Sequence, residues 1–192
     1  MKVTHTDLEG LVVFEPGDAW CRTGDLMRRD ERGYFTRTLD VQILADAGID
    51  PASFKQENQS RSYQGVVRGM HGRMNAGEAK LVRCSYGAVL DVVIDTRVGS
   101  ATFGDMRTFL LDDQVHRQVY VPRGFLHGYQ ALTSVTDFCY RIDDFYGPGE
   151  DTTVSCVDPE LAIPWPAPTT IISERDRNGQ SWADYKLFLG VD

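Results

Sequence analysis

The sequence lacks the hydrophobic runs that a membrane protein or a secreted precursor needs. No stretch of the 192 residues approaches the roughly 18 consecutive apolar residues of a membrane-spanning helix. The N-terminal segment also has no apolar core followed by a small-residue cleavage site, which a signal peptide would show. We therefore expect a cytoplasmic protein that does not associate with membranes.

Cysteine and histidine are scarce and widely spaced. The cysteines are Cys21, Cys84, Cys139 and Cys156. Since none of them forms a CxxC pair, we predict buried free thiols rather than disulfides. The two nearest histidines, His116 and His127, are eleven positions apart, whereas β-barrels that bind zinc or iron usually present two closely spaced histidines with a carboxylate. Nucleophile-elbow, phosphate-loop and dinucleotide motifs are missing as well. We predict no metal and no cofactor.

Basic residues are outnumbered by acidic ones. The chain has 20 Lys and Arg against 28 Asp and Glu, and its formal net charge is −8. Proteins that bind nucleic acids or anionic membranes need a basic surface, so neither function is expected. If the ligand is an anion, it must bind a local cationic pocket within an acidic surface.

Short segments with alternating apolar and polar residues dominate the middle of the chain. They lie between glycine-rich turns, which is typical of an antiparallel sandwich or small barrel rather than of βαβ units. The predicted strands are 80–86, 88–96, 107–111, 118–122 and 135–142. Helices are predicted only at 40–48 and 181–190, each beginning with a polar N-cap. The proline-rich segment 157–170 is predicted to be an ordered loop, and residues 1–192 to form a single domain.

Strand 135–142 carries a tyrosine on its apolar face. Phe138, Tyr140 and Ile142 share that face, so they should point into the barrel. A buried phenol needs a hydrogen-bond partner. On the residues alone, Tyr140 is either a core tyrosine bonded to a backbone carbonyl or a functional group.

His71 stands between two glycines in the β-rich stretch VVRGMHGRMNAGEAKLVRC. Gly69 and Gly72 let a ligand or another backbone segment come close, and a neutral imidazole accepts protons readily at neutral pH. The neighbouring cations suited to phosphate are Arg68, Arg73 and Lys80. Strict alternation puts Arg68 and His71 on opposite faces, so a shared pocket requires a bulge at Gly69. The alternative is a structural histidine in the core.

Three other polar residues have ambiguous settings. His127 lies in VPRGFLHGY, which is typical of a turn. Arg32, in RDERGYF, would suit a nucleotide or phosphate, or equally a solvated turn before a strand. Asp176, in ISERDRNG, is predicted to be a loop acid. The surrounding residues assign no role to any of the three.

The order of motifs along the chain resembles the RmlC-like dTDP-4-dehydrorhamnose 3,5-epimerases. The resemblance extends over about residues 8–185, and the matching segments are DERGYF, FKQENQSRSYQGVVRGMH, KLVRC, VLDVVIDTRVGSATFG, YVPRGFLHGY, CYRIDDFYGP, DPELAIPWP and ISERD. The resemblance implies an all-β fold, a cupin-type double-stranded β-helix (jelly roll) with a few short peripheral helices. It also implies a homodimeric isomerase that inverts C3 and/or C5 of a nucleoside-diphosphate 4-keto-deoxysugar without metal or cofactor.

By the same resemblance, five residues fall on positions that act on the sugar. His71 matches the general base, Asp176 the aspartate that orients it, and Tyr140 the proton donor on the opposite face of the sugar. Lys80 matches a lysine that lies, with His127, near the C4 oxygen. A hydrogen next to a C4 ketone is acidic only when the forming enolate is stabilised. A base, cations at the oxygen and an acid on the far face therefore suit an epimerase.

The resemblance also assigns substrate-binding residues, and the sequence differs from the family pattern at several positions. Arg32 and Arg68 match positions that bind the diphosphate and nucleotide. The further substrate-contacting positions are Gln56, Asn58 and Tyr146. Arg175, which precedes Asp176 and departs from the family pattern, is also predicted to bind substrate. The family's RGLHYQ is RGMHGR here, and the stretch 16–30 is longer, so the nucleotide base and the sugar stay open. We interpret the glycine that follows His71 as a replacement that widens the sugar pocket.

Two other functions stay open at this point. A non-catalytic cupin that binds nucleotide sugars would exchange no sugar protons with solvent. A metal-dependent cupin enzyme would carry iron or zinc, which the histidine spacing disfavours.

Overall fold

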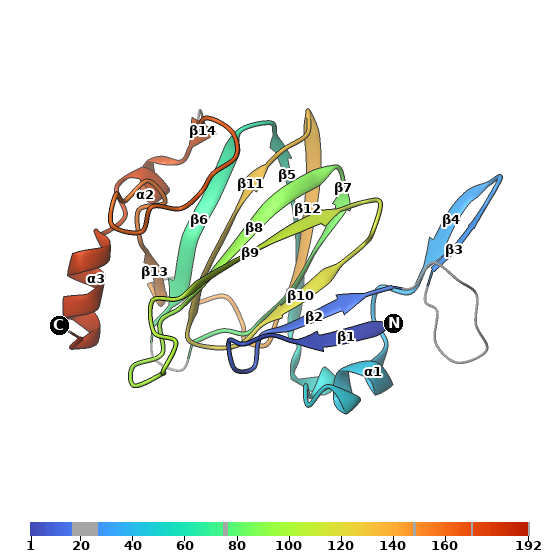
Figure 1. Cartoon of the computed structure of the whole chain (residues 1–192), viewed down its shortest axis with the longest axis horizontal. Helices are drawn as coiled ribbons and strands as arrows, with labels where there is room; N and C mark the ends of the chain where they lie inside the picture. The colour runs from blue at the N-terminus through green and yellow to red at the C-terminus, as the bar shows by residue number, and fades with distance from the viewer. Residues whose placement is uncertain (17–26, 75–76, 148, 170, 192) are drawn as a thin grey trace.

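Two β-sheets facing each other form the body of the protein, for which a computed structural model describes residues 1–16, 27–74, 77–147, 149–169 and 171–191 (Figure 1). Cys21 and most of the stretch 16–30 lie outside these ranges. In spatial order, the first sheet consists of β1 (Lys2–His5), β2 (Val12–Glu15), β10 (Gln118–Val121), β7 (Lys80–Tyr86), β12 (Val135–Ile142) and β5 (Gln56–Tyr63). The second consists of β13 (Asp151–Thr153), β6 (Val66–Arg73), β11 (Phe125–Ala131), β8 (Ala88–Asp95) and β9 (Met106–Asp112), with β14 (Ile171–Ile172) also pairing with β6.

The predicted all-β jelly roll is confirmed. All five strands predicted from alternation exist, as β7, β8, β9, β10 and β12, with ends within a residue or so of those expected. The strands of the two large sheets pair antiparallel, except that β14 runs parallel to β6. Cys84, Cys139 and Cys156 are buried free thiols, as predicted.

Strand β11 corrects the prediction of a turn around His127. The turn is confined to Gly124, whose φ is +82°, and the chain is extended from Phe125 onward. The second glycine, Gly128, lies inside the strand because β6 passes very close to it. A Cβ at Gly128 would approach the carbonyl oxygen of Arg68 to 2.8 Å. A glycine within a strand can therefore indicate close backbone approach rather than a turn.

Strand β6 contains the irregularity that the sequence required. His127 pairs with His71 and Tyr129 with Arg68, so two steps along β11 correspond to three along β6. The extra residue brings Arg68 and His71 to the inner side, while Met70 packs into the hydrophobic cluster on the outer side. The bulge thus puts both polar side chains on one wall.

The helices are short and peripheral. α1 (Val41–Asp46) and α3 (Trp182–Leu189) match the two predictions and begin at the N-caps Asp40 and Ser181. A 3₁₀ turn, η1, follows at Pro51–Ser53. The described part of the proline-rich segment, 157–169, forms neither helix nor strand, as predicted. A further helix, α2 (Glu174–Arg177), stands where a loop was predicted. None of the described helices is long and apolar enough to cross a membrane.

A two-stranded hairpin projects from the body of the protein. It consists of β3 (Met27–Asp30) and β4 (Gly33–Thr36), which pair only with each other within the described residues. Figure 1 shows it standing away from both large sheets. Tyr34 and Phe35 on it are 49% and 72% exposed.

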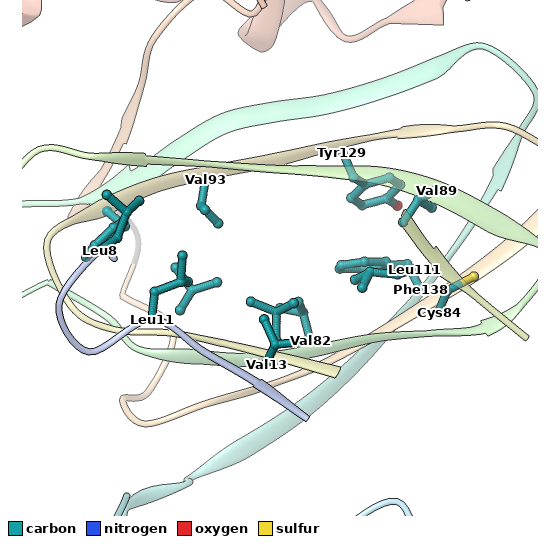
Figure 2. Packing of buried hydrophobic residues seen from close by; sticks show 13 residues of the cluster. Leu8, Leu11, Val13, Val82, Cys84, Val89, Val93, Leu111, Tyr129 and Phe138 are labelled. Carbon is teal, nitrogen blue, oxygen red and sulfur yellow. The ribbon is translucent and has the colours of Figure 1, made fainter. Parts of the chain in front are cut away.

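The main hydrophobic core fills the space between the two large sheets. Figure 2 shows Val82 and Phe138 reaching in from one sheet and Val93 and Tyr129 from the other. The rings of Tyr129 and Phe138 stack with their centroids 4.2 Å apart. A second cluster, which includes Trp182 of α3, covers the outer face of the second sheet. Since apolar side chains pack against both of its faces, this sheet provides a rigid wall for the groups that it presents inward.

Candidate active site

A cavity of about 550 Å³, including the space at its mouth, opens between the two sheets beside the main core. Its lining comes from five strands and consists of Ser60, Arg68, His71, Lys80, His127, Gly128, Tyr129, Phe138 and Tyr140. The stacked rings of Tyr129 and Phe138 line the cavity on one side and pack in the hydrophobic core on the other. The cavity therefore has an apolar floor and polar walls, which is the usual character of a small-molecule site.

His71 is paired with a carboxylate from outside the sheet. Its Nε2 lies 2.6 Å from Oδ1 of Asp176, while the other carboxylate oxygen accepts the Gly69 N–H at 3.4 Å. Burial alone would raise the pKa of Asp176, but the hydrogen bond and charge of His71 outweigh it and lower that pKa. The cap formed by Ser173 holds α2, and with it Asp176, against β6. The ring is a third exposed, whereas the carboxylate is almost completely buried.

Asp176 is not the loop acid that its own neighbourhood predicted. It is the one buried residue of α2, with 3% of its surface exposed. The segment SERD supplies a serine N-cap followed by acids in the first turn, and both features favour a helix start. That pattern could have identified the helix from the sequence.

His127 forms a second histidine–aspartate pair. Its Nε2 lies 2.7 Å from Oδ1 of Asp91 on β8, and Asp91 is completely buried. The other oxygen of Asp91 has no hydrogen-bond partner among the described residues. Sequence reasoning missed this residue. A usable signal existed, because an aspartate in the middle of the apolar strand AVLDVVID must be buried and therefore needs a partner.

The two tyrosines of the cavity differ in what holds their hydroxyls. The Tyr129 hydroxyl is within hydrogen-bond distance of Ser60 Oγ (2.9 Å) and Ser62 Oγ (3.1 Å). Within the described chain, the Tyr140 hydroxyl makes no hydrogen bond to a backbone carbonyl. The interpretation of Tyr140 as a core tyrosine bonded to a carbonyl therefore gains no support. Burial raises the pKa of Tyr140, and nearby Glu78 raises it further, so the phenol form is favoured.

Lys80 begins β7 at the wall of the cavity. Burial lowers the pKa of its ammonium, and the charge of Glu78, whose Oε1 lies 3.5 Å from Nζ, opposes that shift. Arg68 reaches the same cavity from β6, where its Nε donates to Ser62 Oγ at 3.1 Å. The cavity thus has two cationic side chains within an acidic protein, as an anionic ligand requires.

The remaining predicted binding residues are not among those that line the cavity. Asn58 pairs directly with Tyr140 across β5 and β12. Gln56 and Tyr146 are exposed and joined by a hydrogen bond from the Tyr146 N–H to Gln56 Oε1. Arg175 is exposed and paired with Asp151. It lines an open groove that also includes Arg68 and His71. The groove and the cavity therefore share two lining residues, Arg68 and His71.

Arg32 is the predicted binding residue that the structure keeps away from the cavity of its own chain. It lies at the tip of the projecting β3–β4 hairpin (Figure 1), where its guanidinium bonds Asp30. It lines a separate hollow on that hairpin together with Arg28 and Tyr34.

The interpretation of Gly72 as widening the sugar pocket is wrong. Gly72 does not line the cavity. A Cβ built on it would point to the opposite side, where it would meet Leu126 Cδ2 at 3.0 Å and Thr152 Cγ2 at 3.2 Å. Strand alternation explains the error, because the residue that follows the inward-facing His71 must face outward.

Among the described residues, no three His, Cys, Asp or Glu side chains are grouped so that they could hold a metal ion. The two histidines of the cavity are directly opposite each other on β6 and β11, but each ring nitrogen Nε2 is taken by its own aspartate. The side chains present are instead those of acid–base chemistry: two imidazoles with carboxylate partners, an ammonium and a phenol.

Comparison with known proteins gives one consistent answer. Residues 5–184 match the family described as dTDP-4-dehydrorhamnose 3,5-epimerase. The enzyme of that name from Pseudomonas aeruginosa is 36% identical, covering 98% of this chain and 99% of its own. The dTDP-4-dehydrorhamnose 3-epimerase of Streptomyces niveus is 42% identical over 79% of this chain and 73% of its own. The crystal structure of the 3,5-epimerase from Bacillus anthracis with TDP and PPi bound is 35% identical, with a TM-score of 0.85, covering 94% of this chain and 98% of that one.

Proposed function

The chain belongs to the dTDP-4-dehydrorhamnose 3,5-epimerase family, and we propose that it inverts C3, C5 or both carbons of a dTDP-linked 4-keto-6-deoxy sugar. The observation that carries the proposal is the grouping of His71, Lys80 and Tyr140 around one cavity, with Asp176 bonded to His71. These are a base with its orienting carboxylate, a cation for the developing oxyanion and an acid.

His71 is the proposed base. When its Nε2–H donates to Asp176, the other ring nitrogen is left without a proton and can accept one from the sugar carbon. The carboxylate then stabilises the imidazolium that forms. The carbon–hydrogen bond breaks, its electron pair moves into the enolate, and negative charge develops on the C4 oxygen.

Lys80 and His127 are the proposed stabilisers of that oxygen. An ammonium at the cavity wall is a strong hydrogen-bond donor to an enolate in a site partly screened from water. His127 donates its Nε2–H to Asp91, so an interaction with the sugar has to use the other side of its ring. With the Asp91 carboxylate behind it, the ring can carry a second proton and donate it to the oxygen.

Tyr140 is the proposed acid on the opposite face of the sugar. Its phenol returns a proton to the same carbon while the enolate electrons re-form the carbon–hydrogen bond, which inverts that centre. The tyrosinate is then reprotonated by solvent, and His71 releases its proton likewise. No electrons are gained or lost overall, so the chemistry needs no redox partner.

The nucleotide part of the substrate is assigned by similarity. The related enzymes carry dTDP sugars in their names, and the Bacillus anthracis structure holds TDP. Arg68 and Arg175 both border the open groove, which would give a diphosphate two guanidinium groups. We include Gln56, Asn58 and Tyr146 as further substrate contacts.

We include a homodimer in the proposal, because in a dimer Arg32 of one copy could bind the substrate held in the cavity of the other copy. The hairpin that carries Arg32 projects from the body and exposes Phe35. If it reaches the cavity of a second copy, Arg32 meets that copy's nucleotide. Mixing Arg32→Ala and His71→Ala proteins should then restore activity, since one site of each mixed dimer is intact. Mixtures that gain no activity over the separate proteins would rule this arrangement out.

We also propose that one domain, residues 1–192, carries this function in the cytoplasm. Free thiols at Cys84, Cys139 and Cys156 support a reducing compartment.

Uptake of solvent deuterium tests the function directly. The protein is incubated in D2O with dTDP-4-keto-6-deoxyglucose, and NMR follows deuterium at C3 and C5. We expect uptake and inversion at one or both carbons. A non-catalytic binding protein would incorporate none, and preference for a GDP-, UDP- or CDP-linked substrate would contradict the assigned nucleotide.

Tyr140→Phe tests the acid on the opposite face. Removal of the hydroxyl should leave deuterium exchange by His71 measurable while slowing inversion about 100-fold. Tyr120→Phe is the matched control, because Tyr120 is also partly buried but packs in another cluster and does not line the cavity. Equal loss in both variants would exclude a specific role for Tyr140.

A further inference from the structure

A cluster of charged side chains lies behind the cavity wall, and one of its carboxylates, Glu78, has no role in the function proposed above. Arg73 of this cluster also lies within ion-pair distance of Asp151 (3.8 Å) and Asp144 (4.0 Å). Glu78 Oε1 lies 3.5 Å from Lys80 Nζ, and Oε2 lies 3.2 Å from Arg73 Nη2. The side chains of Arg73, Glu78 and Lys80 are only 4%, 10% and 15% exposed. Buried charges are costly unless they are paired, so these side chains must be considered as one unit.

The backbone holds Glu78 in register with Lys80. The residue between them, Ala79, is buried, and its N–H donates to Asp143 Oδ1 at 2.8 Å. In an extended segment, side chains two positions apart point to the same side, so Glu78 and Lys80 leave the chain together. Arg73, at the end of β6, is fixed in turn because its Nη1 donates to the Phe145 carbonyl at 2.9 Å. The carboxylate therefore has little freedom to move away from the ammonium.

The same carboxylate also acts on Tyr140, which lies on β12, the strand next to β7 in the same sheet. Burial lowers the pKa of Lys80, and Glu78 is the leading opposing influence. Burial raises the pKa of Tyr140, and the charge of Glu78 raises it further. Both effects favour the protonated form, which is the form that each residue needs in the proposed reaction. The other titratable or charged groups facing these two side chains are Arg68, His71 and Arg73 of β6, His127 and Tyr129 of β11, and Asp151 of β13.

We propose that Glu78, held by Arg73, is a positioning residue that keeps the Lys80 ammonium charged and aligned at the cavity wall. It acts through Lys80 and Tyr140 and does not touch the sugar. Its functional importance rests on the proposed epimerase reaction, but its effect on Lys80 does not. The two can therefore be tested separately.

The kinetic test uses Glu78→Gln, which keeps the shape of the side chain and removes its charge. Without that charge, the pKa values of Lys80 and Tyr140 both fall. The alkaline limb of the kcat profile should therefore move about one pH unit or more toward acid, since one nearby charge shifts a pKa by about that much. At a given pH on that limb kcat should fall about tenfold, with KM little changed, because the lost interaction is with the enolate.

Direct observation of Lys80 separates this inference from the proposed function. The protein is labelled with ¹³C-lysine, and the side-chain resonance of Lys80 is identified by its loss in Lys80→Arg. The other lysines, Lys2, Lys55 and Lys186, serve as internal references. The titration of Lys80 should move toward acid by a similar amount in Glu78→Gln, whether or not any sugar is turned over.

Glu160→Gln is the matched control, because it removes the carboxylate of another Glu–Lys pair, with Lys186 of α3, at the surface. It should leave the Lys80 titration and the kcat profile unchanged. If Glu78→Gln does not fold, Glu78→Asp should give a smaller shift of the same sign. An unmoved Lys80 titration and alkaline limb in a folded Glu78 variant would overturn the proposal. A wild-type protein without deuterium uptake would overturn the proposed function instead.

Discussion

The two histidine–aspartate pairs of the cavity lie side by side on neighbouring strands of one sheet but are built differently. His71 is a third exposed, and its carboxylate comes from α2, outside the sheet. His127 is 8% exposed, and its carboxylate comes from the adjacent strand β8 within the sheet. Asp176 is also bonded by the Gly69 N–H, whereas one oxygen of Asp91 has no partner in the described chain.

This difference suits two different tasks. A ring that exchanges protons with a substrate and with solvent needs access, and a carboxylate with several hydrogen bonds keeps it oriented through both charge states. A ring that only supplies a hydrogen bond or charge benefits from burial, because the interaction is stronger away from water. We therefore expect the His71 pair to move protons and the His127 pair to stabilise charge.

The largest effect is expected at the exposed pair. His71→Ala removes the base and should reduce solvent-deuterium uptake about 1,000-fold. The protein should stay folded but unfold at a lower temperature, because the buried Asp176 carboxylate loses its partner. Turnover at a near-normal rate in a folded His71→Ala protein would mean that another group is the base.

Asp176→Asn is expected to follow, with a loss of about 100-fold in deuterium uptake. The amide can keep the shape of the contact, but it cannot stabilise the imidazolium and can favour the wrong tautomer. Since binding of dTDP does not depend on the base, the affinity for dTDP measured by calorimetry should stay within a factor of two or so of wild type. A large loss of dTDP affinity would show that Asp176 is needed for the shape of the site instead.

Asp91→Asn should give a smaller loss, about tenfold in kcat, because Lys80 still stabilises the enolate oxygen. The imidazole N–H proton that His127 donates to Asp91 should give a downfield NMR signal that moves in the variant. If kcat is unchanged while that signal moves, the pair is structural, and the division of tasks between the two pairs does not hold.

Local patterns predicted what depends on neighbours in the sequence. Alternation identified β7, β8 and β12 and put Tyr140 on the inner face, and polar residues identified the N-caps of α1 and α3. The alternation of side chains also showed that Arg68 and His71 can line the same wall only if a bulge lies between them, and β6 has that bulge.

What the local patterns missed depends on contacts between distant segments. The local pattern predicts a turn at Gly128. The residue is in fact a glycine because the backbone of β6 passes close to it, and the sequence does not show that β6 is its neighbour. The partnership of Asp176 with His71 came only from resemblance to a family, since α2 reaches β6 through the fold. Asp91 is the exception, because a carboxylate within an apolar strand already indicates a buried partner.

The smallest catalytic effect is expected at Asp95, four residues after Asp91 on β8 and equally buried. Burial alone would raise its pKa, but hydrogen bonds from Arg97, Thr102 and Ser100 lower it from 3.8 to about 2. The folded-state pKa is thus depressed, so the stabilisation is present above the unfolded value and is lost as the pH falls toward 2. It amounts to about 2 kcal/mol at neutral pH.

Asp95→Asn should therefore lower the free energy of unfolding by about that amount at pH 7, and by much less near pH 2. Deuterium uptake should stay near the wild-type rate, because Asp95 bonds a loop and does not line the cavity. Chemical denaturation at several pH values, together with the exchange assay, measures both. Asp91→Asn should give the reverse pattern, with lost turnover and a smaller change in stability. If the two variants lose activity equally, the effect of Asp91 comes from burying an aspartate on β8 rather than from its bond to His127.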